Sequence, residues 1–200
     1  SVHEVEGVER IRLGSLEPRV ITEDFARTLA ALPKVCPHFH LSLQSGCDET
    51  LRRMNRHYTS GEYYEKCLLL REHFENPALT TDVIVGFPGE SEEEFAASKA
   101  FVEKVNFYET HIFKYSRREG TKAAAMGNQL PEQVKARRSE EMIRLGAKKR
   151  KRYEESLFGK ELEALMEESV MVGGRRMWCG HTREYLKVAL DGDEDMRNKL

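Results

Sequence analysis

The sequence has few cysteines and no closely spaced ones. Its four cysteines are Cys36, Cys47, Cys67 and Cys179, and no two of them stand in a Cys-x-x-Cys arrangement. This absence excludes the usual zinc and iron–sulfur ligand motifs from the chain as given. We expect the four thiols to be reduced, as is usual in a cytosolic setting.

Long apolar runs are also missing. No stretch is long enough to span a bilayer, and the first residues do not have the pattern of a signal peptide. We therefore expect a cytoplasmic protein. The hydrophobic content of 40% and charged content of 33% predict a soluble, globular chain, and 200 residues suffice for one good-sized domain or slightly more.

One stretch, residues 80–91, predicts a strand, a loop and a helix in immediate succession. Val83 to Val85 form a β-branched apolar run directly after Asp82, and residues 86–89 are the turn-forming Gly-Phe-Pro-Gly. Ser91 then begins a helix as its N-cap, with Glu94 three residues later as in a capping box. In α/β folds, function gathers in the loops after such strands.

Strands and helices alternate on both sides of this stretch. The pattern predicts strands at residues 8–15, 38–44, 83–85 and 108–115, and helices at residues 23–32, 48–55, 60–75 and 92–104. Helical crossovers imply a parallel sheet with right-handed connections. The fold class is therefore α/β.

The predicted strands are apolar on one face and polar on the other. In residues 38–44, Phe39, Leu41 and Leu43 alternate with His40, Ser42 and Gln44. A doubly wound sheet covered on both faces would be apolar on both, so the alternation favours a barrel or half barrel with a polar lumen. The alternative explanation for any one of these polar residues is that they pair with one another to fill a barrel interior.

The C-terminal third changes character. Residues 131–158 read as one long helix, and residues 131–160 hold ten basic against five acidic residues, with the bases concentrated in Lys148 to Arg152. That run is either a solvated helix face or an RNA-facing patch. After Gly159 short strands are predicted at 161–166 and 185–190, with a turn at Gly173-Gly174. We interpret residues 1–158 as one domain and residues 159–200 as an incomplete small β-barrel.

Five stretches in order resemble the radical S-adenosylmethionine methylthiotransferases. They are residues 10–18 (RIRLGSLEP), 40–46 (HLSLQSG), 54–59 (MNRHYT), 81–90 (TDVIVGFPGE) and 113–121 (FKYSRREGT). Residues 44–50 and 115–121 look most like the MtaB-type subgroup, which modifies N6-threonylcarbamoyladenosine in tRNA. The resemblance covers nearly the whole chain.

This resemblance implies a partial (β/α) barrel that binds S-adenosylmethionine and a [4Fe–4S] cluster, followed by a TRAM-like RNA-binding β-barrel. It implies insertion of a methylthio group at C2 of an adenosine beside the tRNA anticodon. Family members also carry an N-terminal domain and a Cys-x-x-x-Cys-x-x-Cys loop, which this chain does not contain. We therefore expect a C-terminal portion that is inactive alone, because three thiolates are needed to hold the iron.

We predict cofactor contacts along the polar face and the strand ends. Arg12 is expected to pair with the cofactor carboxylate or, alternatively, with Asp82 or Glu17 in a barrel ion pair. The full set of predicted cofactor-binding residues is Arg12, Ser42, Gln44, Asp82, Ile84, Gly86, Phe113 and Tyr115. The predicted RNA-binding or substrate-binding residues are Arg56, Arg117, Arg118, Lys148, Lys149 and Arg150. We assign no catalytic base and no metal ligand, and we leave His38, His40 and His57 without a role.

Two other functions are weighed against this one. The chain is alternatively a stand-alone RNA-binding or scaffolding module on half a barrel. A barrel lyase or aldolase using Asp82 and Glu17 is a third hypothesis, but no lysine stands on the polar face for Schiff-base chemistry. An open strand edge at residues 10–14 also predicts edge pairing between chains.

Overall fold

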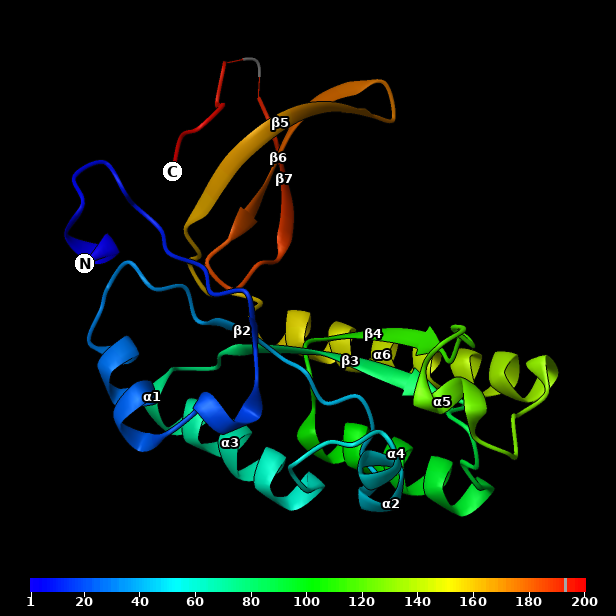
Figure 1. Cartoon of the computed structure of the whole chain (residues 1–200). Coiled ribbons are helices and arrows are strands. Elements are labelled where there is room, and N and C mark those ends of the chain that lie inside the picture. Colours follow the sequence, from blue (N-terminus) through cyan, green and yellow to red (C-terminus); the bar gives the residue numbers. More distant parts are fainter. Residues whose placement is uncertain (193) are drawn as a thin grey trace.

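The computed structural model describes residues 1–192 and 194–200, which form two sheets (Figure 1). The larger sheet is parallel, with its strands in sequence order. These strands are β1 (Ser15–Leu16), β2 (His38–Leu41), β3 (Ala78–Val85) and β4 (Glu109–Lys114). Each strand therefore lies beside the next one in the chain, as the predicted helical crossovers require.

The helices occupy one side of this sheet. They are α1 (Glu23–Ala30), α2 (Asp48–Arg53), α3 (Ser60–His73), α4 (Glu92–Val105), α5 (Lys122–Ala125) and α6 (Glu132–Glu155), with short 3₁₀ turns η1 (Val2–Glu4) and η2 (Pro18–Val20). Figure 1 shows α1 to α4 together beneath the parallel sheet, with α6 running along β4. None of the described helices lies over the opposite face of the sheet, which we call the open face (Figure 1).

Local sequence signals explain where the helices begin. Ser91 caps α4, because its hydroxyl accepts from the Glu94 amide at 3.2 Å while the Glu94 carboxylate accepts from the Ser91 amide at 3.0 Å. Thr59 and Glu62 build the same capping box at the start of α3. The predicted strand–loop–helix at residues 80–91 is thus confirmed, although β3 begins earlier, at Ala78.

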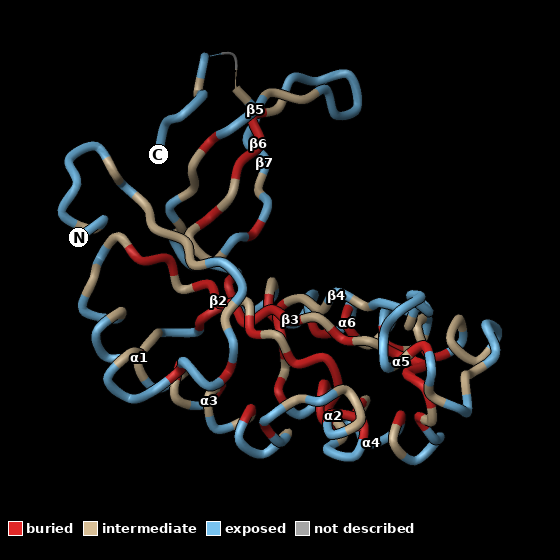
Figure 2. Tube along the Cα trace, in the orientation of Figure 1, coloured by how far each residue is buried: buried red, intermediate tan, exposed pale blue. Residues whose placement is uncertain are grey.

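The core lies between the parallel sheet and its helices. Phe39, Leu41, Val83 and Val85 are fully buried on the helix side. Burial alternates with exposure at the end of β3, where Asp82 and Ile84 are only half-buried. Figure 2 shows the buried segments gathered in this sheet and the faces of the helices beneath it. The predicted division into an apolar and a polar face is therefore present.

Helix α6 packs closely against β4 at Gly146. A Cβ atom at this position would lie 2.4 Å from the hydroxyl oxygen of Thr110, so only glycine permits the approach. Met142 and Tyr153 are buried on the same helix. None of the described helices is long and apolar enough to cross a membrane.

The second sheet is antiparallel, with strands β5 (Ala164–Val172), β6 (Arg175–Thr182) and β7 (Lys187–Asp191) in that order. The predicted Gly173-Gly174 turn joins β5 to β6, and both glycines have positive φ. Trp178, Cys179 and Met166 are its buried residues of apolar type. This sheet stands beyond the end of the parallel sheet near the N-terminal segment (Figure 1).

One predicted strand is wrong. Residues 8–15 were expected to form a continuous strand, but β1 holds only Ser15 and Leu16, preceded by an isolated bridge between Ile11 and Val35. The guanidinium group of Arg10 donates to the His181 carbonyl at 3.0 Å. The segment is therefore held at the antiparallel sheet, away from regular pairing.

Candidate functional site

The four parallel strands end together at one edge of the sheet. β2, β3 and β4 run on into residues 42–44, 86–89 and 115–121, and β1 is followed by Glu17. Loops at this carboxyl edge are where α/β folds place their ligands. The candidate site therefore begins at this edge.

The backbone leaves the regular ladder of the sheet after Ser42, whose amide still donates to the Leu16 carbonyl at 3.2 Å. Beyond Leu41, the Leu43 amide donates to the Thr81 hydroxyl at 3.1 Å, in place of a strand carbonyl. Pairing resumes at Gln44, whose φ is +69°, and whose amide donates to the Asp82 carbonyl at 2.9 Å. The Tyr58 hydroxyl also donates to the carbonyls of Ser42 and Leu43 at 2.9 and 3.0 Å.

These contacts fix the backbone of Ser42 and Gln44 at the carboxyl edge. A side-chain hydroxyl can replace a ladder partner without leaving a buried amide unsatisfied. The sequence predicted the two residues, but it did not show the irregular backbone that carries them.

The loop after β3 is held by a buried ion pair. The Glu90 carboxylate accepts from the Gly86 amide at 2.7 Å and from the Arg138 guanidinium at 2.6 Å, and these two side chains are 1% and 2% exposed. Arg138 also donates to the Glu90 carbonyl at 3.0 Å and to Glu92 at 2.8 Å. Burial raises the pKa of Glu90, and the Gly86 amide and Arg138 oppose that rise.

Gly86 itself has φ of +73°, and a Cβ there would lie 2.3 Å from Cγ of Lys135. Glycine is thus required both by the backbone and by the side chain packed on it. Glu90 and Arg138 were missed by sequence reasoning, since Arg138 lies 48 residues away and was counted only among the basic residues of a helix.

Apolar surface lies on the open face beside this loop. Ile84 and Phe113 are register partners on β3 and β4, and Phe113 is 52% exposed although it is a large apolar residue. Tyr115 follows, with its amide donating to the Val85 carbonyl at 2.9 Å and its carbonyl accepting from Lys135 at 3.2 Å. The Tyr115 hydroxyl is buried and has no hydrogen-bond partner among the described residues.

Deeper on the open face, polar side chains from three strands meet. Nε2 of His40 lies 3.4 Å from Oδ2 of Asp82, and its Nδ1 lies 3.0 Å from the Thr80 hydroxyl. His111 is the register partner of Asp82, and its ring centroid is 5.7 Å from that of His40. Asp82 was predicted to lie at the site, whereas His111 was missed, although it falls on the polar positions of its strand.

Arg12 is not where the sequence placed it. It was predicted in the C-terminal half of a strand, but it precedes β1 and lies at the junction of the two sheets. Its guanidinium donates to the carbonyls of Thr182 and Arg183 at 3.2 Å and lies 4.5 Å from the Tyr185 ring centre. These contacts occupy the fork that was expected to bind a cofactor carboxylate.

The three loop arginines lie at the carboxyl edge. Arg56 is 3.5 Å from Glu17, the residue after β1. Arg117 and Arg118 are exposed in the segment after β4. Arg117 lines an open pocket of about 590 Å³ together with Thr121 and Ala124. The lyase hypothesis required Glu17 to act with Asp82, but these carboxylates face Arg56 and His40 respectively.

The basic run on α6 does not form one surface. Lys149 is 6% exposed, lies 4.0 Å from Glu103, and has its pKa lowered by burial. Arg150 is paired with Glu109 and Glu154 at 3.2 and 2.8 Å. The prediction that Lys149 faces RNA is therefore wrong, because a helix turns successive residues to different sides.

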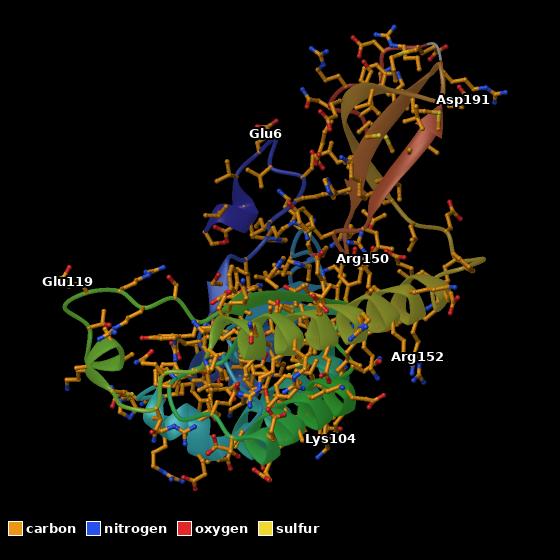
Figure 3. The ribbon with its side chains drawn as sticks, turned by 90° about the vertical axis from the view of Figure 1, so that its right-hand side faces the viewer. Glu6, Lys104, Glu119, Arg150, Arg152 and Asp191 are labelled. Atoms are coloured by element: carbon orange, nitrogen blue, oxygen red, sulfur yellow. The ribbon has the colours of Figure 1, made fainter. Side chains whose placement is uncertain are left out.

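The exposed bases of α6 that have no acidic partner among the described residues follow a spacing of four. Arg144, Lys148 and Arg152 are exposed, and none is within ion-pair distance of an acid in the described chain. We call these three residues the basic stripe. Figure 3 shows Arg150 on the side of α6 toward the antiparallel sheet and Arg152 on the other side.

The cysteines do not fit an iron–sulfur cluster. Cys36, Cys67 and Cys179 are buried and Cys47 is half-buried. The group of at least three potential ligands found among the described residues is His40, Asp82 and His111, which contains no cysteine. No thiolate set for a cluster is therefore assembled in this part of the chain.

Comparison with known proteins shows that the chain is similar to radical SAM proteins and to tRNA methylthiotransferases. The family model of the radical SAM superfamily matches residues 4–102. Threonylcarbamoyladenosine tRNA methylthiotransferase MtaB of Bacillus subtilis is 39% identical over 98% of this chain and 44% of its own length. A tRNA-2-methylthio-N(6)-dimethylallyladenosine synthase of Caldicellulosiruptor saccharolyticus is 41% identical over 83% of this chain and 35% of its own.

Solved structures support the same fold. Escherichia coli coproporphyrinogen III oxidase, a radical SAM enzyme, matches with a TM-score of 0.59 and 21% identity over 70% of this chain and 32% of that chain. Elp3 of Methanocaldococcus infernus matches with a TM-score of 0.53 and 14% identity over 86% and 53%. The chain spans less than half the length of the two curated relatives. The radical SAM family match and the 39% identity to a tRNA methylthiotransferase over 98% of this chain show that the chain belongs to the radical S-adenosylmethionine tRNA methylthiotransferase family.

Proposed function

We propose that this chain is part of an enzyme that inserts a methylthio group at C2 of N6-threonylcarbamoyladenosine beside the tRNA anticodon. The observation that carries this proposal is the carboxyl edge, where exposed apolar residues adjoin a rigid glycine loop and three loop arginines. The similarity to the Bacillus subtilis protein over 98% of the chain supports the same substrate.

The carboxyl edge suits the adenosine part of S-adenosylmethionine. Ile84 and Phe113 offer adjoining apolar surface for the adenine, and Gly86 permits close approach of the backbone on the side away from Lys135. Ser42, Gln44, Asp82 and Tyr115 supply polar groups around it. The cofactor supplies the radical chemistry when bound, and these residues bind and orient it.

The cluster that this chemistry needs is not provided by the four cysteines described above. We therefore propose that the thiolates come from an N-terminal part of the same enzyme and that this chain alone is inactive. Anaerobic reconstitution with iron and sulfide tests this point. We expect no stoichiometric acid-labile sulfide on the chain, and a stable [4Fe–4S] cluster would contradict the proposal.

The charge of the carboxyl edge favours a substrate with a carboxylate. Threonylcarbamoyladenosine carries one, whereas a dimethylallyl group is uncharged, and Arg117 and Arg118 are exposed there with Arg56 close by. Binding of this chain to anticodon stem-loops with and without the threonylcarbamoyl group tests the proposal. We expect tighter binding of the modified RNA, and loss of that preference in Arg117→Ala/Arg118→Ala. Equal binding of both RNAs would contradict it.

The remaining surfaces are proposed to hold tRNA. We propose residues 1–158 as the barrel portion and residues 159–200 as a TRAM-like module whose antiparallel sheet adds to the RNA surface. The basic stripe lies on the intervening helix, and exposed arginines Arg175 and Arg176 lie at the tip of the β5–β6 hairpin. Such patches bind phosphates without reading sequence. A cytoplasmic setting, where tRNA is modified, belongs to this proposal.

A stand-alone RNA-binding or scaffolding module is the second candidate. It is favoured by the basic stripe, which suits RNA phosphates, and by the dispersed cysteines, which do not assemble a thiolate set for a cluster. RNA binding without any preference for the threonylcarbamoyl group would support it. Edge pairing through β1 is a further proposal, and sedimentation of the chain at several concentrations would reveal such a dimer.

A further inference from the structure

We propose that His40, Asp82 and His111 form a binding site for a divalent transition-metal ion of the Zn²⁺ class on the open face. This site lies deeper on the open face than the loops of the carboxyl edge, shares Asp82 with the proposed cofactor contacts, and contains no cysteine. Two imidazoles and one carboxylate are a ligand set that suits such ions, with one coordination position left open.

Three adjacent strands bring these ligands together. Asp82 and His111 are register partners on β3 and β4, and His40 reaches Asp82 from β2. One ligand atom from each residue lies within 4.8 Å of the others. Because the ligands stand on the middle of strands, their backbone positions are fixed by the sheet rather than by mobile loops.

The distances are close to those of a coordinated ion. Bonds of about 2.0–2.1 Å place two tetrahedral ligand atoms about 3.3 Å apart. The His40–Asp82 separation of 3.4 Å already meets that value. His111 is exposed, so its ring is free to turn. Such a turn can bring its ligand nitrogen closer to the ligand atoms of His40 and Asp82 by the remaining ångström or so.

A neighbouring hydroxyl orients the central histidine. Thr80 is 2% exposed, and its hydroxyl lies 3.0 Å from Nδ1 of His40. When Nδ1–H donates to this oxygen, the Nε2 lone pair faces the Asp82 carboxylate. Two electron-rich atoms at that separation repel unless a cation lies between them. A hydrogen bond to the second ring nitrogen is also the usual partner of a metal-bound histidine.

The alternative is a closed hydrogen-bonded group, with the Thr80 hydroxyl donating to Nδ1 and Nε2–H donating to Asp82. That arrangement leaves His111 without a role in the cluster. The two accounts therefore differ in what removal of His111 does.

Titration of the tag-free chain with Zn²⁺ by calorimetry tests the proposal, with Co²⁺ absorption as a second readout of coordination. We expect about one ion per chain, and at least about tenfold weaker binding in His111→Ala and Asp82→Asn. Thr80→Val should weaken binding by a smaller factor, since it removes only the orienting hydroxyl.

His73→Ala is the matched control. His73 lies 2.8 Å from Glu23, so it has the same imidazole–carboxylate pairing but no place in a three-ligand group. It should bind Zn²⁺ like the parent chain. Absence of stoichiometric binding by the parent, or equal binding by parent and His111→Ala, would overturn the site. Because His111 is exposed, the His111→Ala variant removes no core side chain and should fold like the parent chain.

Discussion

The two sheets differ in how they are stabilised. The parallel sheet is buried against helices α1 to α4 and α6 and has a large apolar core of its own, including Phe39, Leu41 and Val83. The antiparallel sheet buries little, and Met171, Val172 and Leu190 are exposed on it. Apolar burial is the main favourable term in folding, so the parallel sheet should be the more stable unit.

The antiparallel sheet depends on its neighbour instead. Leu186 packs with Tyr108, Tyr153 and Leu157 of the parallel-sheet unit. Arg12 donates to the carbonyls of β6 and the residue after it, and Arg183 donates to the carbonyls of Pro33 and Val35. The second sheet is therefore held against the first by a small apolar cluster and by arginines that satisfy backbone carbonyls.

The largest effect is expected from the ion pair under the Gly86 loop. Arg138→Met leaves Glu90 buried without its charge partner and should lower the free energy of unfolding by about 3–5 kcal/mol. Urea denaturation followed by circular dichroism measures it. Arg52→Met is the control, because Arg52 and Glu49 form an exposed pair whose loss should leave the free energy of unfolding nearly unchanged.

A double variant separates charge from packing in this prediction. Glu90→Gln/Arg138→Met removes both charges and should recover much of the lost stability. Equal destabilisation by Arg138→Met and Arg52→Met would show that the pair does not hold the loop.

The junction of the two sheets gives an intermediate effect. Trp178 is the single tryptophan and is buried in β6, so its fluorescence reports on the antiparallel sheet, whereas helical circular dichroism reports on the other unit. Arg12→Ala should lower the free energy of unfolding reported by the fluorescence by about 1–2 kcal/mol and leave the helical transition nearly in place. Identical shifts of both signals would mean that the two sheets unfold as one unit.

The basic stripe should have a smaller effect that appears only in RNA binding. Lys148→Ala/Arg152→Ala should weaken tRNA binding and lower the slope of log affinity against log salt by roughly one per lost phosphate contact. Lys149→Met is the control from the same helix, since Lys149 is buried beside Glu103. An equal loss of tRNA affinity in both variants would indicate that only the overall charge matters and that the basic stripe is not a specific RNA-binding surface.

Thiol reactivity gives the smallest and most local test. Burial raises the pKa of Cys67 to about 12, so at pH 8 its thiol is protonated and shielded. Cys47 is half-buried and should react first. Cys179 should react before Cys67, because opening of the antiparallel sheet exposes only the former. Mass spectrometry of alkylated peptides gives the order, and simultaneous labelling of Cys67 and Cys179 would contradict the difference between the sheets.

Local signals in the sequence predicted much of the parallel sheet. Alternation in residues 38–44 and the capping box at Ser91 and Glu94 depend on neighbours only a few residues apart. The open face, with Asp82 and Ile84 on it, followed from the same two-residue period. These features were predictable because strand faces and helix caps are set by short-range geometry.

The parts that were missed depend on distant contacts. Glu90 is paired with a residue 48 positions later, and Arg12 with carbonyls 170 and 171 positions later. Lys149 is buried because its side of α6 packs near Glu103 of α4, and no run of charges reveals that packing. Sequence pattern shows which residues are charged, but the partner of each charge is decided by packing.

The most direct test of the proposed function supplies what this chain does not assemble by itself. A chimera places this chain in the corresponding 44% of the Bacillus subtilis relative and is expressed in a strain without that enzyme. Mass spectrometry of tRNA nucleosides then measures the product. We predict a methylthio group on N6-threonylcarbamoyladenosine. A folded chimera that modifies only N6-dimethylallyladenosine, or neither nucleoside, would contradict the proposal.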